Sequence, residues 1–301
     1  MPDWKRLPPK LRVLPARNAS SQPTGVTMKI VNAHGAAIPA LGFGVFRMSD
    51  AEVEAVIPAA LEAGFRHFDT AQIYQNEAAL GQALQKAGAR RDDLFLTTKV
   101  WVDNYSEEKF ASSVTESLDK LQVDQVDLLL LHWPAHKVSI AEQVDLLNAV
   151  QASGKTRFIG VSNQNIAQMK ESIERAQTPI VTNQIEVHPY LDQNAIAAAA
   201  KEAGVAITAY FGMADGAVPR DAALQAIGAK YGKTAAQVAL RWLIERGFIA
   251  LSKTSKPERV AENFDLLDFE LNSEDMAAIA KLARPDGRLV SPPELAPVWD
   301  K

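Results

Sequence analysis

The chain has 301 residues and contains no cysteine. Disulfide bonds, thiolate nucleophiles and cysteine-ligated zinc are therefore excluded. The chain also lacks an excess of basic residues, since 32 Lys and Arg stand against 36 Asp and Glu, which argues against a nucleic-acid-binding surface. No apolar run approaches the roughly 18 residues of a membrane-spanning helix. We therefore expect a cytoplasmic protein that binds neither nucleic acid nor membrane.

Residues 1–27 differ in composition from the rest of the chain. They mix proline, basic and small polar residues, and their apolar residues follow neither a helical nor a strand period. They also lack the continuous apolar stretch that is typical of signal peptides. We predict that residues 1–27 form a flexible N-terminal arm and that residues 28–301 form a single domain.

Eight short apolar segments read as buried strands. They are ALGFGVF (40–46), FRHFD (65–69), LFLTTK (94–99), VDLLLLH (126–132), TRFIGVS (156–162), IVTNQIE (180–186), VAITAY (205–210) and FIALSK (248–253). Helical patterns lie between them. One should begin after the N-cap Ser49 and end at Gly64, and another should begin near Ser106. Alternating strands and helices of this kind predict a parallel sheet covered by helices.

Two architectures agree with this pattern, a closed (β/α)8 barrel and an open doubly wound sheet. Roughly 270 residues follow the arm, which is close to the size of a typical barrel. The first strand is not followed by the G-x-G-x-x-G motif of dinucleotide-binding Rossmann folds. We therefore predict the α/β class and a single-domain (β/α)8 TIM barrel.

Polar side chains stand at the ends of several predicted strands. Asp69, Lys99 and His132 end three of them, and Tyr74 follows Asp69 in what reads as a loop. Alone, each has an ordinary structural explanation: a helix cap, a surface ion pair, a buried imidazole or a packed aromatic ring. The carboxyl ends of barrel strands form one rim, however, and catalytic groups of barrel enzymes lie there. Together the four residues favour an active site.

The chemistry of these residues suits protonation of a carbonyl oxygen. A phenol has a pKa of about 10, and a lysine ammonium beside it should lower the pKa of Tyr74. Asp69 would keep Lys99 charged and in position, and His132 could hold the carbonyl oxygen against the phenol. The set needs no nucleophile, in agreement with a chain that lacks both cysteine and the G-x-S-x-G motif.

The chain resembles the aldo-keto reductases over nearly its whole length from about Leu41. The matching segments are GFRHFDTAQIYQNE, TTKVW, LLLLHWP, GVSN, NQIEVHPY and SKTSKPERVAEN. The resemblance implies a (β/α)8 barrel that reduces small aldehydes and ketones to alcohols with NADPH and without a metal. It also implies a catalytic tetrad with Tyr74 as the general acid. The tetrad would consist of Asp69, Tyr74, Lys99 and His132.

The same resemblance implies where the cofactor binds. Ser162, Asn163 and Gln184 would surround the nicotinamide carboxamide, and their donors and acceptors suit an amide ligand. Tyr210 would stack on the nicotinamide ring. The 2′-phosphate and the adenine would be bound by Lys253, Thr254, Ser255, Arg259, Glu262 and Asn263. The anion would lie where a strand ends and a helix begins, which is a favourable place for a phosphate.

Some segments depart from the family pattern. Val45 replaces a threonine, Ser252 a proline and Thr254 a serine, and AYFGMADG stands in place of AYSPLG. These departures bear on cofactor affinity, and on the preference for NADPH over NADH, more than on the chemistry.

The ending RLVSPPELAPVWD and the short loops resemble the diketogluconate reductases within the family, which also reduce methylglyoxal. We therefore expect a monomer that acts on 2-oxoaldehydes such as methylglyoxal and on diketo sugar acids. Phe46, Trp101 and Trp133 would line an apolar substrate pocket, and the two tryptophans would be exposed.

Two other functions remain open from the sequence. A cofactor-sensing binding protein, similar to the potassium-channel β-subunits, would share the fold and the tetrad. An aldolase would form a Schiff base on Lys99, which requires a lysine of lowered pKa in an apolar pocket. Asp69 opposes the aldolase, because a neighbouring carboxylate raises the pKa of a lysine.

Overall fold

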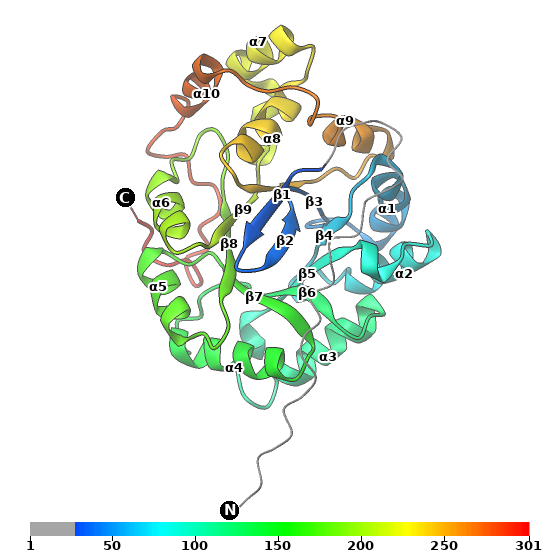
Figure 1. Ribbon diagram of the computed structural model, residues 1–301, viewed down its shortest axis with the longest axis vertical. Helices are drawn as coiled ribbons and strands as arrows, with labels where there is room; N and C mark the ends of the chain where they lie inside the picture. Colours follow the sequence, from blue (N-terminus) through cyan, green and yellow to red (C-terminus); the bar gives the residue numbers. More distant parts are fainter. Residues whose placement is uncertain (1–27, 301) are drawn as a thin grey trace, which may run out of the picture.

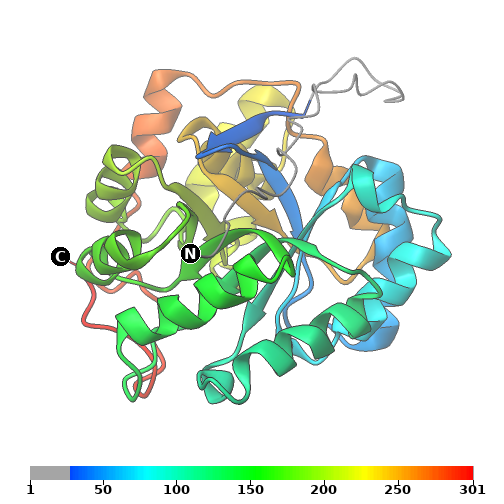
Figure 2. The ribbon, with the colours of Figure 1, turned by 60° about the horizontal axis from the view of Figure 1, so that its bottom comes forward.

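The computed structural model describes residues 28–300, so the predicted arm lies outside the described residues. Eight parallel strands form a closed barrel in the order β3-β4-β5-β6-β7-β8-β9-β10, in which β10 also pairs with β3. Helices surround this barrel on its outside (Figures 1 and 2). The predicted (β/α)8 barrel is confirmed.

Each predicted strand is present, and its bounds differ from the prediction by at most two residues. The barrel strands are β3 (Leu41–Gly44), β4 (His67–Asp69), β5 (Phe95–Val100), β6 (Val126–Leu131), β7 (Thr156–Ser162), β8 (Ile180–Glu186), β9 (Ala206–Tyr210) and β10 (Ile249–Ser252). Every residue of β5, β6 and β8 is buried, because one face of each strand points into the barrel and the other lies under helices.

Side-chain caps precede six of the ten helices between residues 28 and 300. They are α1 (Asp50–Ala63), α2 (Glu77–Lys86), α3 (Phe110–Leu121), α4 (Ile140–Ala152), α5 (Ile166–Arg175), α6 (Asn194–Glu202), α7 (Ala222–Tyr231), α8 (Ala235–Glu245), α9 (Val260–Phe264) and α10 (Ser273–Ala280). Ser49 forms a capping box before α1, and Gly64 ends it with a φ of 112°. The helix expected near Ser106 begins later, because residues 107–109 form a turn and Phe110 is the first residue of the helix.

A hairpin that the sequence analysis did not predict precedes the barrel. Its strands β1 (Ile30–Ala33) and β2 (Ala36–Pro39) pair antiparallel. His34 and Gly35 form the turn with φ angles of 47° and 87°, which suits a two-residue hairpin loop. Ile38 packs against apolar residues inside the barrel.

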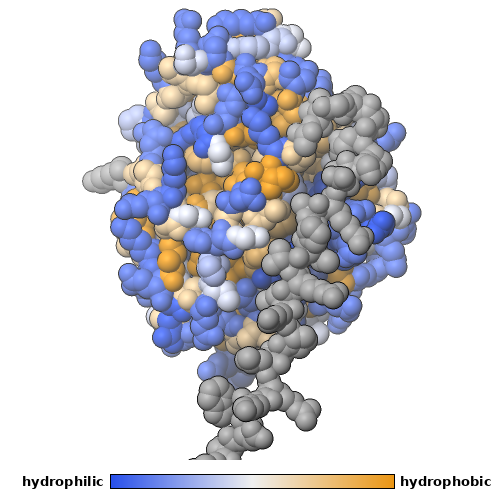
Figure 3. Space-filling model, viewed as in Figure 1, coloured by the Kyte–Doolittle hydropathy of each residue, from blue (hydrophilic) through white to orange (hydrophobic). Residues whose placement is uncertain are grey.

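The hairpin closes the end of the barrel at which the parallel strands begin. It lies across that end in Figure 1. Figure 3 shows the same face of the molecule, with apolar side chains near its centre and mostly polar side chains towards the edge. The opposite end, where the strands finish, remains open to a pocket. Between residues 28 and 300, no helix combines the length and apolarity that crossing a membrane requires.

Candidate active site

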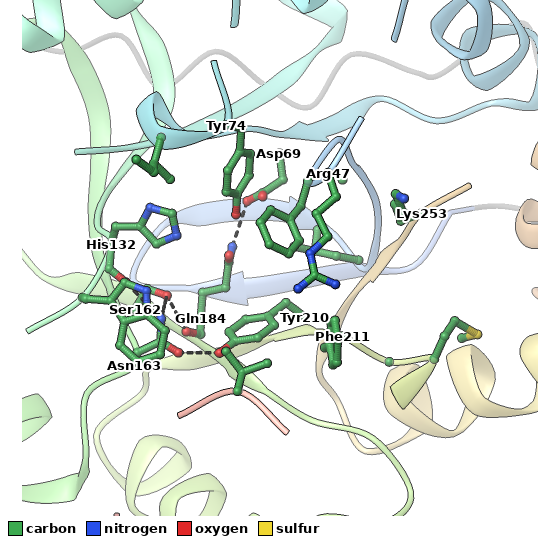
Figure 4. A pocket seen from close by; sticks show the side chains of 18 of the residues that line it. Arg47, Asp69, Tyr74, His132, Ser162, Asn163, Gln184, Tyr210, Phe211 and Lys253 are labelled. Carbon is green, nitrogen blue, oxygen red and sulfur yellow. Dashed lines mark hydrogen bonds between the residues drawn. The ribbon is translucent and has the colours of Figure 1, made fainter. Parts of the chain in front are cut away.

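A pocket of about 500 Å³ lies at the end of the barrel where the strands finish. Most of the residues predicted for the site line it: Phe46, Asp69, Tyr74, Trp101, His132, Trp133, Ser162, Asn163, Gln184, Tyr210 and Lys253. Figure 4 labels all of these except Phe46 and the two tryptophans. Lys99 lies behind this wall, next to Asp69. Residues at the ends of all eight barrel strands, or in the loops that follow them, thus meet at one place, as expected for the rim of a barrel.

A buried ion pair forms the centre of the site. The Nζ of Lys99 on β5 lies 2.5 Å from Oδ1 of Asp69 at the end of β4, and the two side chains are 0% and 4% exposed. The ammonium also donates to the carbonyl oxygen of Thr70 at 2.8 Å and to the hydroxyl of Tyr74 at 3.4 Å. These three acceptors satisfy the buried ammonium and place it against the phenol.

The pKa of Tyr74 differs from the sequence-based expectation. Burial, and to a lesser degree the charge of Asp69, raise it well above the usual value for a tyrosine. Burial lowers the pKa of Lys99, and Asp69 opposes that shift. The expected net lowering of the Tyr74 pKa is therefore wrong for this structure, because burial and the charge of Asp69 outweigh the charge of Lys99. A phenol of raised pKa is protonated at neutral pH.

His132 presents a neutral imidazole to the pocket. Its ring meets the ring of Tyr74 edge-on at 5.6 Å and that of Trp101 at 5.2 Å, measured between centroids. Burial, followed by the charge of Lys99, lowers its pKa well below the usual value for histidine. Its Nδ1 is buried and finds no hydrogen-bond partner among residues 28–300. A neutral imidazole can donate one hydrogen bond, for example to a substrate oxygen.

A chain of hydrogen bonds links the residues predicted around the nicotinamide (Figure 4). Gln184 donates to Oδ2 of Asp69 at 2.8 Å, and Ser162 donates to the backbone oxygen of Gln184 at 2.7 Å. Tyr210 donates to Oδ1 of Asn163 at 2.7 Å. Asn163 adopts a left-handed φ of 59°, which asparagine tolerates better than most residues. The predicted amide-binding group thus lies directly beside the ion pair.

The residues predicted to bind the phosphate and adenine lie on a turn outside this pocket, except for Lys253 at its edge. Thr254, Ser255, Arg259, Glu262 and Asn263 lie between the end of β10 and the end of α9. Lys253 and Arg259 are exposed, and Arg259 pairs with Glu262 only loosely at 3.9 Å. Lys256 is a further exposed cation of the same segment, for which the sequence predicted no role. We call Lys253 to Asn263 the cationic turn.

A carboxylate that was not predicted adjoins the cationic turn. Glu52 belongs to the capping box of α1 and accepts hydrogen bonds from the backbone and side chain of Ser49. These bonds lower its pKa, and smaller contributions come from the hydroxyl of Ser255 and the charge of Lys253. A negative charge therefore lies beside the residues expected to bind a phosphate.

An exposed ion pair lies at the mouth of the pocket. Arg47 follows β3, and its Nη1 lies 3.7 Å from Oδ1 of Asp215. Asp215 belongs to the AYFGMADG loop, where Phe211, Ala214 and Asp215 have positive φ angles of 63°, 46° and 54°. Such angles are uncommon outside glycine. Figure 4 shows Arg47 extending towards Tyr210 and Phe211. The loop was noted as a departure from the family, but its partner was not predicted.

Gln72 is a further residue near the site that the sequence did not predict. It lies on the short 3-10 turn that carries Tyr74 (Gln72–Tyr74). Its Oε1 accepts from the backbone N–H of Trp101 at 2.9 Å and from Asn104 at 2.9 Å, while its Nε2 donates to two serines of α3. The side chain thereby ties the turn of Tyr74 to the wall of Trp101. Its position two residues before the tyrosine was the signal available in the sequence.

The apolar wall differs from the prediction in one respect. Trp101 is half-buried, but Trp133 is only 6% exposed, so the expected exposed pair of tryptophans is wrong. Trp299 near the C-terminus lies against Trp133 with ring centroids 6.4 Å apart. Val290, Pro292 and Leu295 of the same C-terminal segment also line the pocket. Sequence periodicity carries no sign that this segment returns to the barrel.

The described part of the chain offers no cluster of three or more His, Asp or Glu side chains that could hold a metal ion. The donor set of the pocket consists instead of a phenol, an ammonium, an imidazole and amides.

The chain is similar to proteins of a known family. A model of the aldo/keto reductase family matches residues 40–284. The methylglyoxal reductase DkgB of Escherichia coli O157:H7 is 43% identical over 267 residues, which are 88% of this chain and 100% of that protein.

Solved structures give the same result. A crystal structure described as a 2,5-diketo-D-gluconic acid reductase B is 55% identical, with a TM-score of 0.90 over 91% of this chain and 98% of that chain. An aldo-keto reductase of Bombyx mori, solved with NADP, is 34% identical, with a TM-score of 0.80 over 86% of this chain and 94% of that chain.

The chain belongs to the aldo/keto reductase family. It is an oxidoreductase that acts on the carbonyl group of small molecules and uses a nicotinamide cofactor.

Proposed function

We propose that the protein reduces small 2-oxoaldehydes and diketo sugar acids with NADPH, and that Tyr74 is the general acid. The observation that carries the proposal is the hydroxyl of Tyr74 in the pocket, 3.4 Å from the ammonium of Lys99. The substrate classes are suggested by the relatives, which are described as methylglyoxal and 2,5-diketogluconate reductases.

The pocket residues fit a nicotinamide nucleotide. Ser162, Asn163 and Gln184 offer the donors and acceptors that a carboxamide needs, and Tyr210 offers an aromatic ring beside them. The buried hydroxyl of Ser252 lines the same pocket and has no hydrogen-bond partner among residues 28–300, so a ligand could satisfy it. When bound, a reduced nicotinamide supplies the hydride.

The other groups manage the proton and the charge of the substrate oxygen. His132, neutral because of burial, donates a hydrogen bond to the carbonyl oxygen and orients it towards Tyr74. As the oxygen gains negative charge it becomes a stronger base than the phenolate, so even a phenol of raised pKa can protonate it. Lys99 stabilises the phenolate that results, and Asp69 holds Lys99 in position.

The preference for NADPH is assigned to the cationic turn. Lys253 and Arg259 would bind the 2′-phosphate through charge-assisted hydrogen bonds. Lys256 increases the positive charge of the turn, and Glu52 reduces it.

The alternatives receive less support. Burial lowers the pKa of Lys99 despite Asp69, so the expectation that Asp69 keeps this pKa high is wrong. Lys99 is nevertheless fully buried behind Asp69, to which its Nζ is bonded at 2.5 Å, so the amine is not open to attack a substrate carbonyl as a Schiff-base aldolase requires. A cofactor-sensing binding protein would share the tetrad, but the relatives named above are described as reductases.

The test is steady-state oxidation of NADPH with methylglyoxal and a panel of other carbonyl compounds. Tyr74→Phe should bind NADPH normally but lose about 10²- to 10⁴-fold in kcat, the usual contribution of a general acid. Tyr231→Phe is the matched control, because its hydroxyl bonds to Asp275 outside the pocket. Near-normal turnover by Tyr74→Phe would exclude Tyr74 as the acid.

A further inference from the structure

Glu186 is a buried carboxylate that the chemistry above does not use. It ends β8, two residues after Gln184, within the NQIEVHPY segment. The residue is only 1% exposed. A carboxylate buried this far is costly unless hydrogen bonds satisfy it, so its partners indicate its role.

The partners of Glu186 are backbone groups of the C-terminal segment. Its Oε1 accepts from the N–H of Leu289 at 2.8 Å and from Nε2 of His188 at 3.0 Å. Its Oε2 accepts from the N–H of Val290 at 3.0 Å, and Nη1 of Arg288 lies 3.7 Å away. Two successive backbone N–H groups, about a hundred residues further along the chain, thus bind one carboxylate. Such bonds fix the position of the main chain itself.

The segment held in this way is a wall of the active site. Val290, Pro292 and Leu295 line the pocket beside Trp133. The pocket residues proposed to bind the nicotinamide come instead from β7, β8 and β9 and the residue after β7. Movement of the C-terminal segment would therefore change the space left for the substrate more than the contacts of the cofactor.

A stack of side chains continues from the same anchor. The guanidinium of Arg288 lies 3.7 Å from the centroid of the Trp299 ring, and Trp299 packs edge-on against Trp133. Trp299 also donates to the hydroxyl of Ser291 at 3.0 Å. Arg288 and Trp299, which lie before and after the wall in the sequence, are thereby linked to Glu186 through the contact between Glu186 and Arg288.

The far end of the segment has a weaker attachment. The backbone oxygen of Val298 accepts from Asn165 at 3.0 Å, and Asp300 accepts from the N–H of Ile166 at 2.9 Å, at the start of α5. Both contacts involve exposed groups, which water can replace. The bonds at the near end involve a carboxylate that is only 1% exposed, which water replaces less easily.

We propose that Glu186 is a positioning residue for the carbonyl substrate. By binding the N–H groups of Leu289 and Val290, it fixes the apolar wall of Val290, Pro292 and Leu295 and so limits the size of substrate admitted. The inference rests on the proposed reductase function, because it assigns the substrate to this side of the pocket.

The central variant is Glu186→Gln, which keeps the size of the side chain. An amide can accept at its oxygen but not at its nitrogen, so one of the two backbone N–H groups loses its acceptor. We expect KM for methylglyoxal to rise about tenfold, the effect of losing one charge-assisted hydrogen bond, while kcat and the Kd of NADPH change less than about twofold. The ratio of kcat/KM for a small over a bulky aldehyde should fall.

Glu294→Gln is the matched control, since it makes the same charge change on an exposed residue of the same segment. It should leave KM unaltered. A second readout needs no activity: amide hydrogen exchange at Leu289 and Val290 should accelerate in Glu186→Gln and stay unaltered in Glu294→Gln.

These readouts separate the two proposals. A wild-type protein that reduces no carbonyl compound with NADPH would defeat the proposed function, while faster exchange in Glu186→Gln would still establish the anchor. Unchanged KM and size preference in an active Glu186→Gln protein would overturn the positioning role, as would unchanged exchange at Leu289 and Val290. If Glu186→Gln does not fold, Leu289→Pro removes one of the N–H donors without altering the barrel, and an unaltered KM there would equally overturn it.

Discussion

Each end of the barrel contains a buried carboxylate that pairs with one or more cations, but the surroundings of those cations differ between the two ends. At the closed end, Asp127 pairs with Arg91 at 2.7 Å and Arg157 at 2.6 Å, and those arginine side chains are 32% and 55% exposed. At the open end, Asp69 pairs with Lys99, which is fully buried next to Tyr74. The cations at the closed end face solvent, whereas the cation at the open end faces a phenol. A carboxylate–cation pair therefore has a structural role where the cation faces solvent, and a functional role where the cation also contacts a phenol.

Exchanging each carboxylate for an amide should separate the two roles. Asp69→Asn leaves Lys99 without its countercharge and should lower kcat by about 100-fold or more, as expected when the positioning of a general acid is lost. Asp127→Asn should leave kcat/KM unchanged and lower the free energy of unfolding by about 1–3 kcal/mol, because it breaks buried charge-assisted hydrogen bonds. Steady-state kinetics and denaturant unfolding on both variants are the measurements. Normal turnover by Asp69→Asn would show that Asp69, like Asp127, has only a structural role.

At the open end, we expect the buried charges of Asp69 and Lys99 to affect the rate of reduction. The exposed charges of the cationic turn should instead affect the preference for NADPH over NADH. Arg259→Ala should raise KM for NADPH about tenfold or more, because a charge-assisted hydrogen bond to the phosphate is lost. KM for NADH should stay nearly constant, since NADH lacks the 2′-phosphate, and kcat should persist with both cofactors. Equal effects on NADPH and NADH would show that the cationic turn binds something else.

Both ends also contain a histidine that burial keeps neutral. The pKa of His67 is lowered by burial at the closed end, and that of His132 is lowered further at the open end. A histidine of depressed pKa takes up a proton more readily in the unfolded chain, so stability present above about pH 6.5 is lost as the pH falls towards the folded-state pKa.

We therefore expect the free energy of unfolding to fall between pH 7.5 and 5.5 by up to about 1.4 kcal/mol per pH unit for each histidine. His67→Gln should reduce this slope, because glutamine does not titrate and can still bond to Thr97. Denaturant unfolding at several pH values measures the slope. A slope that is the same in wild type and His67→Gln would exclude a contribution from the closed end.

The closed and open ends also differ in how far the sequence predicts them. The barrel strands follow from apolar runs, and the meeting of Asp69, Lys99 and His132 at one rim follows from their places at strand ends. The hairpin was missed because its short strands carry small residues such as Ala33 and Ala36, whose burial depends on the barrel above them. The partners of Glu186 and Arg47 were missed because sequence separation hides which loops meet at the rim.

The pKa of Tyr74 shows a further limit. The sequence correctly predicts that Lys99 lies next to the phenol. It does not predict the pKa of Tyr74, which depends on the lysine charge, on the counterion Asp69 and on burial. That balance depends on distances of a few ångströms and on how many apolar atoms surround the group, and both are properties of the folded chain.

The smallest expected effect concerns Glu52, whose charge adjoins the cationic turn. Glu52→Gln keeps an acceptor for the backbone N–H of Ser49, so the capping box of α1 should survive. Removing the negative charge should lower KM for NADPH about threefold, the size expected for an exposed charge, and leave KM for NADH unaltered. Glu54→Gln is the matched control, because Glu54 lies on the same helix but pairs with Lys86 of α2. The difference should shrink at high salt, where exposed charges are screened. A Glu52→Gln protein with the NADPH preference of wild type would place the phosphate away from Ser255 and Lys253.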